Sequence, residues 1–292
     1  MDGFKHVRGN TYCLENKTNI GVIKTNNDVI LIDSGNDKDA GRKLRMLFEQ
    51  NDVTLKYILN THSNADHIGA NAYLINHYQC LAYGKDREVC FSKYPDLEGS
   101  LLYGGFPIKE MRNKFLMAKP SMMNDIATLK SDINYFDVPG HFLDMIAFIT
   151  SDDVIFLGDA LFSSEIINKY HLFYIFDIKK YLITLDELLK LNDLNKYIFV
   201  PSHGIISTDI RAVIKLNKAK IEEICSLIMK IVIDKVGFEE ILQKIFNYYH
   251  LQLDLNQYLL IGSTIRNYLS YLHDENKIDF ILENNRLLYQ TI

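Results

Sequence analysis

The sequence predicts an α+β protein in which a largely buried sheet is covered by helices, followed by a mainly helical C-terminal region. Up to residue 207, short apolar runs of strand length alternate with segments whose apolar residues recur at helical spacing. Several strand-like runs end directly at turns that contain histidine or aspartate. Residues 209–275 are nearly all compatible with helix and include no proline. We therefore expect one domain over residues 1–207 and a second over residues 208–292.

The first domain should begin with three strands, two of which form a hairpin around residues 26–28. In the helix that follows, Leu44, Leu47 and Phe48 share one face. The expected elements are strands 11–14, 20–24 and 29–32, helix 39–50, strand 57–59, helix 70–78, strands 81–83, 133–138, 145–149 and 154–157, helix 178–191 and strand 197–200.

The segment 86–130 gives no clear periodicity. It contains Gly104, Gly105, Pro107, Pro120 and four methionines. Two interpretations stay open: an irregular helical insertion near the mouth of a site, or a plain connecting loop.

The C-terminal region should contain a long helix within residues 209–236 and two more at 238–249 and 256–273, followed by a hairpin around residues 283–285. Helices closed by a hairpin resemble a winged-helix domain. Residues 209–292 carry ten Lys and Arg against eleven Asp and Glu, a balance of −1, so a nucleic-acid partner is not expected. We expect this region to pack over the substrate or to form a homodimer contact.

The composition favours a cytoplasmic protein. The net charge is −5, and no run of apolar residues is long enough to predict a membrane span or a membrane partner. The first six residues lack the apolar core of a signal peptide. The four cysteines (Cys13, Cys80, Cys90 and Cys225) show no paired spacing and are expected to be reduced thiols.

The most informative stretch runs from Thr61 to Gly69. It places His62, Asp66 and His67 within six residues, between the strand-like run 57–59 and a helix. Metal-binding groups on a strand-to-helix turn are held by rigid elements and still face an open mouth. This arrangement is typical of a catalytic metal site.

This stretch resembles the His-x-His-x-Asp-His motif of the metallo-β-lactamase-fold hydrolases, with Asn64 in place of the second histidine. Other segments resemble the family pattern in the same order, and together they span about residues 8–207: the strand and loop 29–35, the Gly-His turn 138–141, the strand end 156–160 and the last histidine turn 200–204. The resemblance implies a four-layer αββα sandwich, with the winged-helix-like region as an addition.

The resemblance also implies the metal ligands. The first metal would take His62, Asn64 and His141, and the second would take Asp66, His67 and His203. Asp159 would bridge the two ions. Imidazole and carboxylate ligands favour zinc, with iron or manganese as alternatives.

Asn64 weakens the first site, because a neutral amide oxygen is a poorer ligand for zinc than an imidazole. Three outcomes stay open: two ions with the first exchangeable, one ion at the second site with Asp159 as its fourth ligand, or no ion.

The resemblance implies a metal-dependent hydrolase that uses a metal-activated water on a small ester, thioester or lactone. Asp66 is the candidate catalytic residue, since it would orient that water and take up a proton. Asp33 is expected to fix the orientation of a ligand histidine. The alternatives are an iron-dependent oxidoreductase or a phosphodiesterase of the same fold, and a non-catalytic, metal-stabilised binding or regulatory protein.

Overall fold

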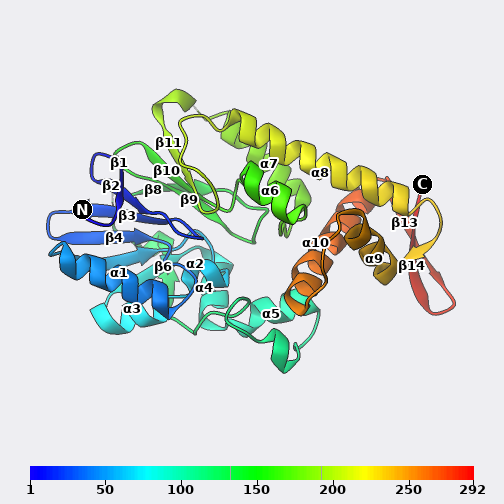
Figure 1. Ribbon diagram of the computed structural model, residues 1–292, viewed down its shortest axis with the longest axis horizontal. Coiled ribbons are helices and arrows are strands. Elements are labelled where there is room, and N and C mark those ends of the chain that lie inside the picture. Colours follow the sequence, from blue (N-terminus) through cyan, green and yellow to red (C-terminus); the bar gives the residue numbers. More distant parts are fainter. Residues whose placement is uncertain (132, 192) are drawn as a thin grey trace.

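The computed structural model describes residues 1–131, 133–191 and 193–292 (Figure 1). Its N-terminal sheet has seven strands, antiparallel from β1 to β4 and parallel from β4 to β7. In spatial order the strands are β1 (Lys5–Arg8), β2 (Thr11–Leu14), β3 (Ile20–Thr25), β4 (Asp28–Ile32), β5 (Thr54–Leu59), β6 (Leu81–Gly84) and β7 (Met123–Asp125).

A second sheet has four strands in the order β11 (Ile198–Pro201), β10 (Val154–Gly158), β9 (Ile146–Ile149) and β8 (Asn134–Asp137). β10 pairs in parallel with β11 and antiparallel with β9, so this sheet is mixed as well. The expected hairpins at residues 26–28 and 151–153 are both present, since β3 pairs with β4 and β9 with β10.

The two sheets face one another and carry helices on their outer sides. Between them lies an apolar cluster that includes Ile30, Leu59, Phe148 and Phe156. Helices α1 (Lys38–Gln50) and α3 (Asn71–Tyr78) cover the first sheet, and α6 (Ser164–Tyr170), α7 (Ile178–Leu189) and α8 (Arg211–Ile231) lie over the second (Figure 1). This is the four-layer order that the resemblance implied.

The segment 86–130 is helical at its start, which favours the insertion over the plain loop. It contains α4 (Asp86–Lys93), α5 (Asp96–Tyr103) and two short 3₁₀ turns (Lys109–Met111 and Ile126–Thr128). It also contributes β7, which adds in parallel to β6 at the sheet edge. No sequence pattern indicated this strand, because it is only three residues long.

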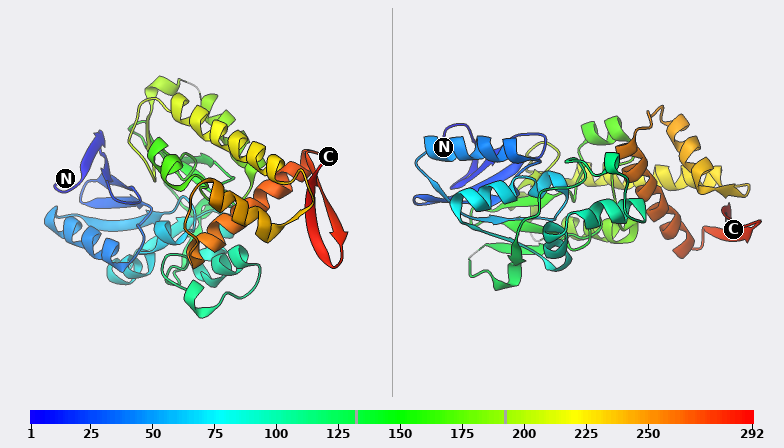
Figure 2. Two further views of the ribbon diagram at one scale, coloured as in Figure 1. Left: turned by 45° about the vertical axis from the view of Figure 1, so that its right-hand side comes forward. Right: turned by 90° about the horizontal axis from the view of Figure 1, so that it is seen from below.

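The C-terminal region contains helices α8, α9 (Phe238–Tyr248) and α10 (Leu255–Asp274), and a small sheet of β12 (Val236–Gly237), β14 (Arg286–Thr291) and β13 (Ile278–Glu283). The long helix expected within residues 209–236 is α8, which ends at Ile231 because Val236 enters β12. The two chain ends lie at opposite ends of the molecule (Figure 2). Over the residues described, the helices are too short or too polar to cross a membrane.

The C-terminal region packs against the insertion through α10 and α5. Leu259 of α10 is 1% exposed and lies in one apolar cluster with Leu102, Met111 and Leu116. The side chain of Asn113 donates a hydrogen bond to Asn256 Oδ1 at 3.0 Å beside this cluster. The helix α5 therefore packs against residues more than 150 positions later in the chain.

Leu259→Ala should lower the free energy of unfolding by about 2–4 kcal/mol, because it leaves a cavity in this cluster. Urea unfolding followed by circular dichroism measures the change. The matched control is Leu253→Ala, at a leucine that is 59% exposed, which should stay within about 0.5 kcal/mol of the wild type. Equal, small effects of both changes would show that α5 and α10 are not held by this contact.

Candidate metal centre

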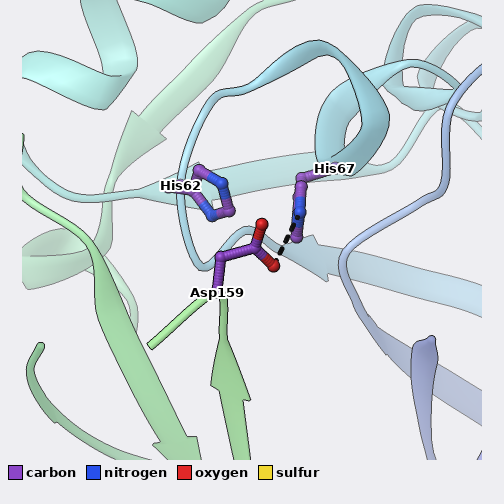
Figure 3. Close-up of side chains that lie close together, drawn as sticks. All are labelled: His62, His67 and Asp159. Carbon is purple, nitrogen blue, oxygen red and sulfur yellow. Dashed lines mark ion pairs between the residues drawn. The ribbon is translucent and has the colours of Figure 1, made fainter. Parts of the chain in front are cut away.

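Four loops bring histidine and aspartate side chains to one place. His62 and the short helix α2 (Ala65–Ile68) follow β5, and the remaining three loops follow β8, β10 and β11. These three loops deliver His141, Asp159 and His203. Figure 3 shows His62, His67 and Asp159 converging from two of these loops.

The ligand-type atoms of this cluster are close together. His203 Nε2 lies 3.1 Å from Asp66 Oδ2 and 3.4 Å from Asp159 Oδ2. His67 Nε2 lies 3.4 Å from Asp159 Oδ1, and His141 Nε2 lies 3.5 Å from Asp159 Oδ2. Atoms bound at about 2.0–2.2 Å to one tetrahedral ion are roughly 3.3–3.6 Å apart, so these spacings are those of shared ligands.

Two overlapping groups of three have ligand atoms within 4.8 Å of one another: Asp66, His67 and His203, and His62, His67 and Asp159. The first group is the second site that the resemblance implied. In the other group, His62 lies with His67 and Asp159, and its ring centroid is 5.0 Å from that of His141. His141 also contacts Asp159 and Asn64.

Each histidine is oriented by a partner on its other ring nitrogen. Nδ1 of His67 lies 2.8 Å from Asp33 Oδ2, which is the contact expected of Asp33. Nδ1 of His203 and of His141 face the backbone carbonyls of Lys17 and Tyr174 at 2.8 and 2.9 Å. Since these oxygens only accept hydrogen bonds, each Nδ1 carries a proton, and in the neutral ring each Nε2 offers a lone pair to the cluster.

His62 is also oriented by a hydrogen bond at Nδ1, in this case with the Thr61 hydroxyl. The Thr61 hydroxyl donates to Asp33 Oδ2 at 2.8 Å and therefore accepts from His62 Nδ1 at 3.0 Å. Thr61 N–H also donates to Asp33 Oδ1. Asp33 thus holds His62 and His67 together.

The glycine before His141 has a packing role. Gly140 has a φ of 125°, and a Cβ at this position would lie 2.3 Å from the backbone nitrogen of Tyr181. Only glycine combines that backbone conformation with that close approach. Gly140 therefore lets the His141 loop lie directly on the start of α7.

The cluster has the unsatisfied atoms that a cation would bind. Within the described part of the chain, His62 Nε2, His67 Nε2 and Asp159 Oδ1 are buried and have no hydrogen-bond partner. Buried polar atoms are rarely left unpaired, because each costs about 1–3 kcal/mol. A divalent cation with nitrogen and oxygen ligands, such as zinc, satisfies all three, so the residues fit a metal.

Charge in the cluster is strongly coupled. Burial raises the pKa of Asp159, but the neighbouring His203, His67 and His141 outweigh burial and hold this pKa well below its usual range. Burial lowers the pKa of His67, but Asp66, Asp33 and Asp159 outweigh it and raise this pKa well above normal. The aspartates therefore stay ionised, and without metal they raise the pKa values of His67 and His203, whereas burial lowers the pKa values of His62 and His141.

Two glutamates of the segment 86–130 accept hydrogen bonds from the loops that carry the candidate ligands. The sequence did not predict a role for either glutamate. Glu88 Oε2 accepts hydrogen bonds from the backbone N–H and the hydroxyl of Ser63, and its Oε1 accepts from Asp144 N–H. Glu98 Oε1 accepts from Asn64 Nδ2. Burial raises the pKa of Glu88 to about 7 and that of Glu98 well above its usual range. Glutamates in short helices are usually exposed, so no sequence pattern distinguished them.

Other histidine and tyrosine side chains lie away from the cluster or play other roles. His171 stacks on Tyr249 of the C-terminal region, with ring centroids 4.6 Å apart. Tyr103 and Tyr170 are 41% and 39% exposed. Tyr174 packs its ring edge-on to His141 at 5.6 Å and orients that residue through its carbonyl.

The fold and the ligand loops define a protein of the metallo-β-lactamase type. Residues 15–203 match the Metallo-beta-lactamase superfamily, and the chain belongs to this superfamily.

Two curated relatives are both named hydroxyacylglutathione hydrolase. The protein from Pelagibacter ubique is 30% identical over 155 residues, covering 52% of this chain and 54% of the relative. The protein from Pectobacterium atrosepticum is 29% identical over 140 residues, covering 47% and 44%. The chain thus spans about half the length of the curated relatives it matches.

Solved structures show the same fold over more of the chain. A metallo-beta-lactamase family protein from Thermus thermophilus has a TM-score of 0.70 at 18% identity, covering 94% of each chain. A beta-lactamase domain protein from Burkholderia ambifaria has a TM-score of 0.73 at 14% identity, covering 99% of this chain and 93% of the other. Since both matches extend beyond residue 203, the fold similarity includes the helical C-terminal region.

Glu88→Gln should lower the free energy of unfolding by about 1–3 kcal/mol, because one end of the glutamine amide must present N–H to a donor of Ser63 or Asp144. Urea unfolding of the metal-free protein at pH 8 measures this change. Glu165→Gln, at an exposed glutamate of α6, is the control and should be nearly neutral. A neutral Glu88→Gln would mean that this carboxylate does not hold the two loops.

Metal uptake should release protons. The raised pKa values of His67 and His203 keep both rings protonated at neutral pH without metal, and a ligand histidine must be neutral. Affinity should therefore rise with pH until both rings lose their protons. Calorimetry of Zn²⁺ binding at pH 7, in two buffers of different ionisation enthalpy, should report about two protons released per protein. His203→Ala should remove about one of them, and buffer-independent heats would refute this protonation.

Proposed function

We propose that this protein is a zinc-dependent hydrolase that cleaves a small thioester or a related ester or lactone. The observation that carries the proposal is the convergence of four Nε2 lone pairs on the carboxylates of Asp66 and Asp159 at the ends of parallel strands. A bound ion at these residues supplies a water of lowered pKa and polarises the substrate carbonyl. Iron and manganese suit the same ligands and are the alternatives to zinc.

Asp66 is the candidate for handling the proton. Its side chain is 35% exposed, whereas that of Asp159 is 6% exposed, so Asp66 is the carboxylate that can exchange a proton with solvent. The Thr18 hydroxyl donates to Asp66 Oδ2 at 3.0 Å and fixes its orientation. Asp66 can therefore orient a water and take up its proton, while buried Asp159 maintains the negative charge of the centre.

The thioester preference follows from the curated relatives. By their printed name they act on an acyl-glutathione, which is a thioester. Because the similarity covers about half of each relative, the substrate's acyl and thiol parts are left open. The geometry of the site suits attack of a water on any small activated carbonyl.

The C-terminal region is, in our proposal, winged-helix-like and serves packing. The order α8, β12, α9, α10 and the hairpin β13–β14 supports this. α10 lies against α5 and α7, so it is not free to enter a nucleic-acid groove. The exposed Phe280, Leu282 and Leu287 of the hairpin support a homodimer contact. The four free cysteines support a cytoplasmic protein.

Elemental analysis of protein purified without added metal, followed by a panel of thioesters, esters, lactones and phosphodiesters, tests the function. We expect zinc and turnover of at least one thioester. Asp66→Ala and His203→Ala should lower kcat/KM by about 10²-fold or more, while His77→Ala, at an exposed histidine, should leave it unchanged. Turnover of phosphodiesters alone, or none with metal bound, would refute the proposal and favour the phosphodiesterase or the binding protein.

A further inference from the structure

Asn64 stands where the family motif has a histidine, and both ends of its amide are occupied. Nδ2 donates to Glu98 Oε1 at 2.7 Å, and Oδ1 lies 3.1 Å from His141 Nε2. Asn64 is 8% exposed and Glu98 is 7% exposed, so solvent competes little for these contacts. The amide therefore joins a helix of the insertion to a ligand histidine.

The Glu98 carboxylate decides which way the amide points. Glu98 Oε1 accepts the hydrogen bond from Asn64 Nδ2, so the N–H side of the amide faces Glu98. The amide oxygen is then turned toward His141. Without an acceptor at Glu98, the planar amide could rotate and place its N–H₂ group against His141 instead.

The contact between Asn64 and His141 brings two lone pairs together. His141 Nδ1 donates a hydrogen bond to the Tyr174 carbonyl, so Nε2 of the neutral ring is an acceptor. Asn64 Oδ1 is also an acceptor. Two acceptors 3.1 Å apart repel unless a proton or a metal ion lies between them. Ligands at about 2.0–2.2 Å from one ion have nearly this separation when the angle at the ion is about 90–100°.

We propose that Glu98 is a positioning residue that turns the Asn64 amide so that its oxygen joins His141 in holding a metal ion. The pair of Asn64 and Glu98 thereby replaces the imidazole that the motif lacks. This inference rests on the proposed metal centre, but not on the reaction that the centre performs.

The α4–α5 insertion therefore contributes to metal binding without providing a ligand itself. Glu98 lies in the first turn of α5, next to Gly99, and α5 is packed on its other side against α10. The position of the Asn64 oxygen consequently depends on how α5 packs against α10.

A double-mutant cycle on metal affinity tests the inference. Metal-free wild type, Glu98→Leu, Asn64→Ala and the double variant are titrated with Zn²⁺ against a chromophoric chelator. We expect two ions in the wild type. Each single variant should bind the weaker ion about 10–100-fold less tightly, because an orienting partner or a ligand is lost, and should leave the tighter ion unchanged. The double variant should lose no more than either single variant.

Glu98→Gln is the conservative rescue, since its amide oxygen can still accept from Asn64, and it should stay within about threefold of the wild type. Asp96→Asn removes a charge from the same turn of α5 at an exposed position and is the matched control. Asn64→His should tighten the weaker ion. The visible spectrum of the Co²⁺-loaded protein should change in Asn64→Ala and Glu98→Leu, and not in the control.

Three results would overturn the inference: unchanged affinity for both ions in folded Glu98→Leu, additive losses in the double variant, or a wild type that binds a single ion. If Glu98→Leu fails to fold, Asn64→Ala decides, because a wild-type stoichiometry and cobalt spectrum there exclude the amide as a ligand. A protein that binds both ions as expected but hydrolyses nothing would refute the proposed function and leave this inference standing.

Discussion

The carboxylate of Asp33 is the constraint on which the centre depends. It accepts hydrogen bonds from the Thr61 backbone, the Thr61 hydroxyl and His67 Nδ1. Because the Thr61 hydroxyl also accepts from His62 Nδ1, Asp33 orients His62 through Thr61. Asp33 has a φ of 59°, in the left-handed region, directly after β4. Non-glycine residues in that conformation cost about 1 kcal/mol or more and persist where surrounding contacts hold them. A single strained residue therefore sets the orientation of two imidazoles.

Electrostatics explains why this polar cluster can exist in the interior. Buried carboxylates are unfavourable unless they are paired, and here they are surrounded by three buried imidazoles and by that of His203, which is 18% exposed. Protons satisfy the cluster only in part, since buried nitrogen and oxygen atoms remain without partners in the described residues. A divalent cation satisfies both charge and coordination at once. The apolar layer between the two sheets lies beneath the cluster and keeps it shielded from solvent on that side.

The sequence predicted most strands of the two sheets, and the reason is physical. Apolar runs that end at a turn with His62, Asp159 or His203 combine burial with a change in polarity, and both signals are local. The same dependence on local signals explains why the sequence did not predict the buried glutamates. Nothing near Glu88 or Glu98 in the chain marks them as buried, because their partners Ser63, Asp144 and Asn64 are 25 to 56 positions away. The candidate site residues were predicted by resemblance, whereas the pairing of Asn64 with Glu98 required three-dimensional information.

The packing of α5 on α10 has a consequence for ion retention. Substitutions at the far end of the polypeptide, such as at Leu259, can alter how firmly an ion is retained without touching any ligand. A shortened polypeptide that lacks α10 would leave Leu102, Met111 and Leu116 without the apolar side chain of Leu259 that buries them.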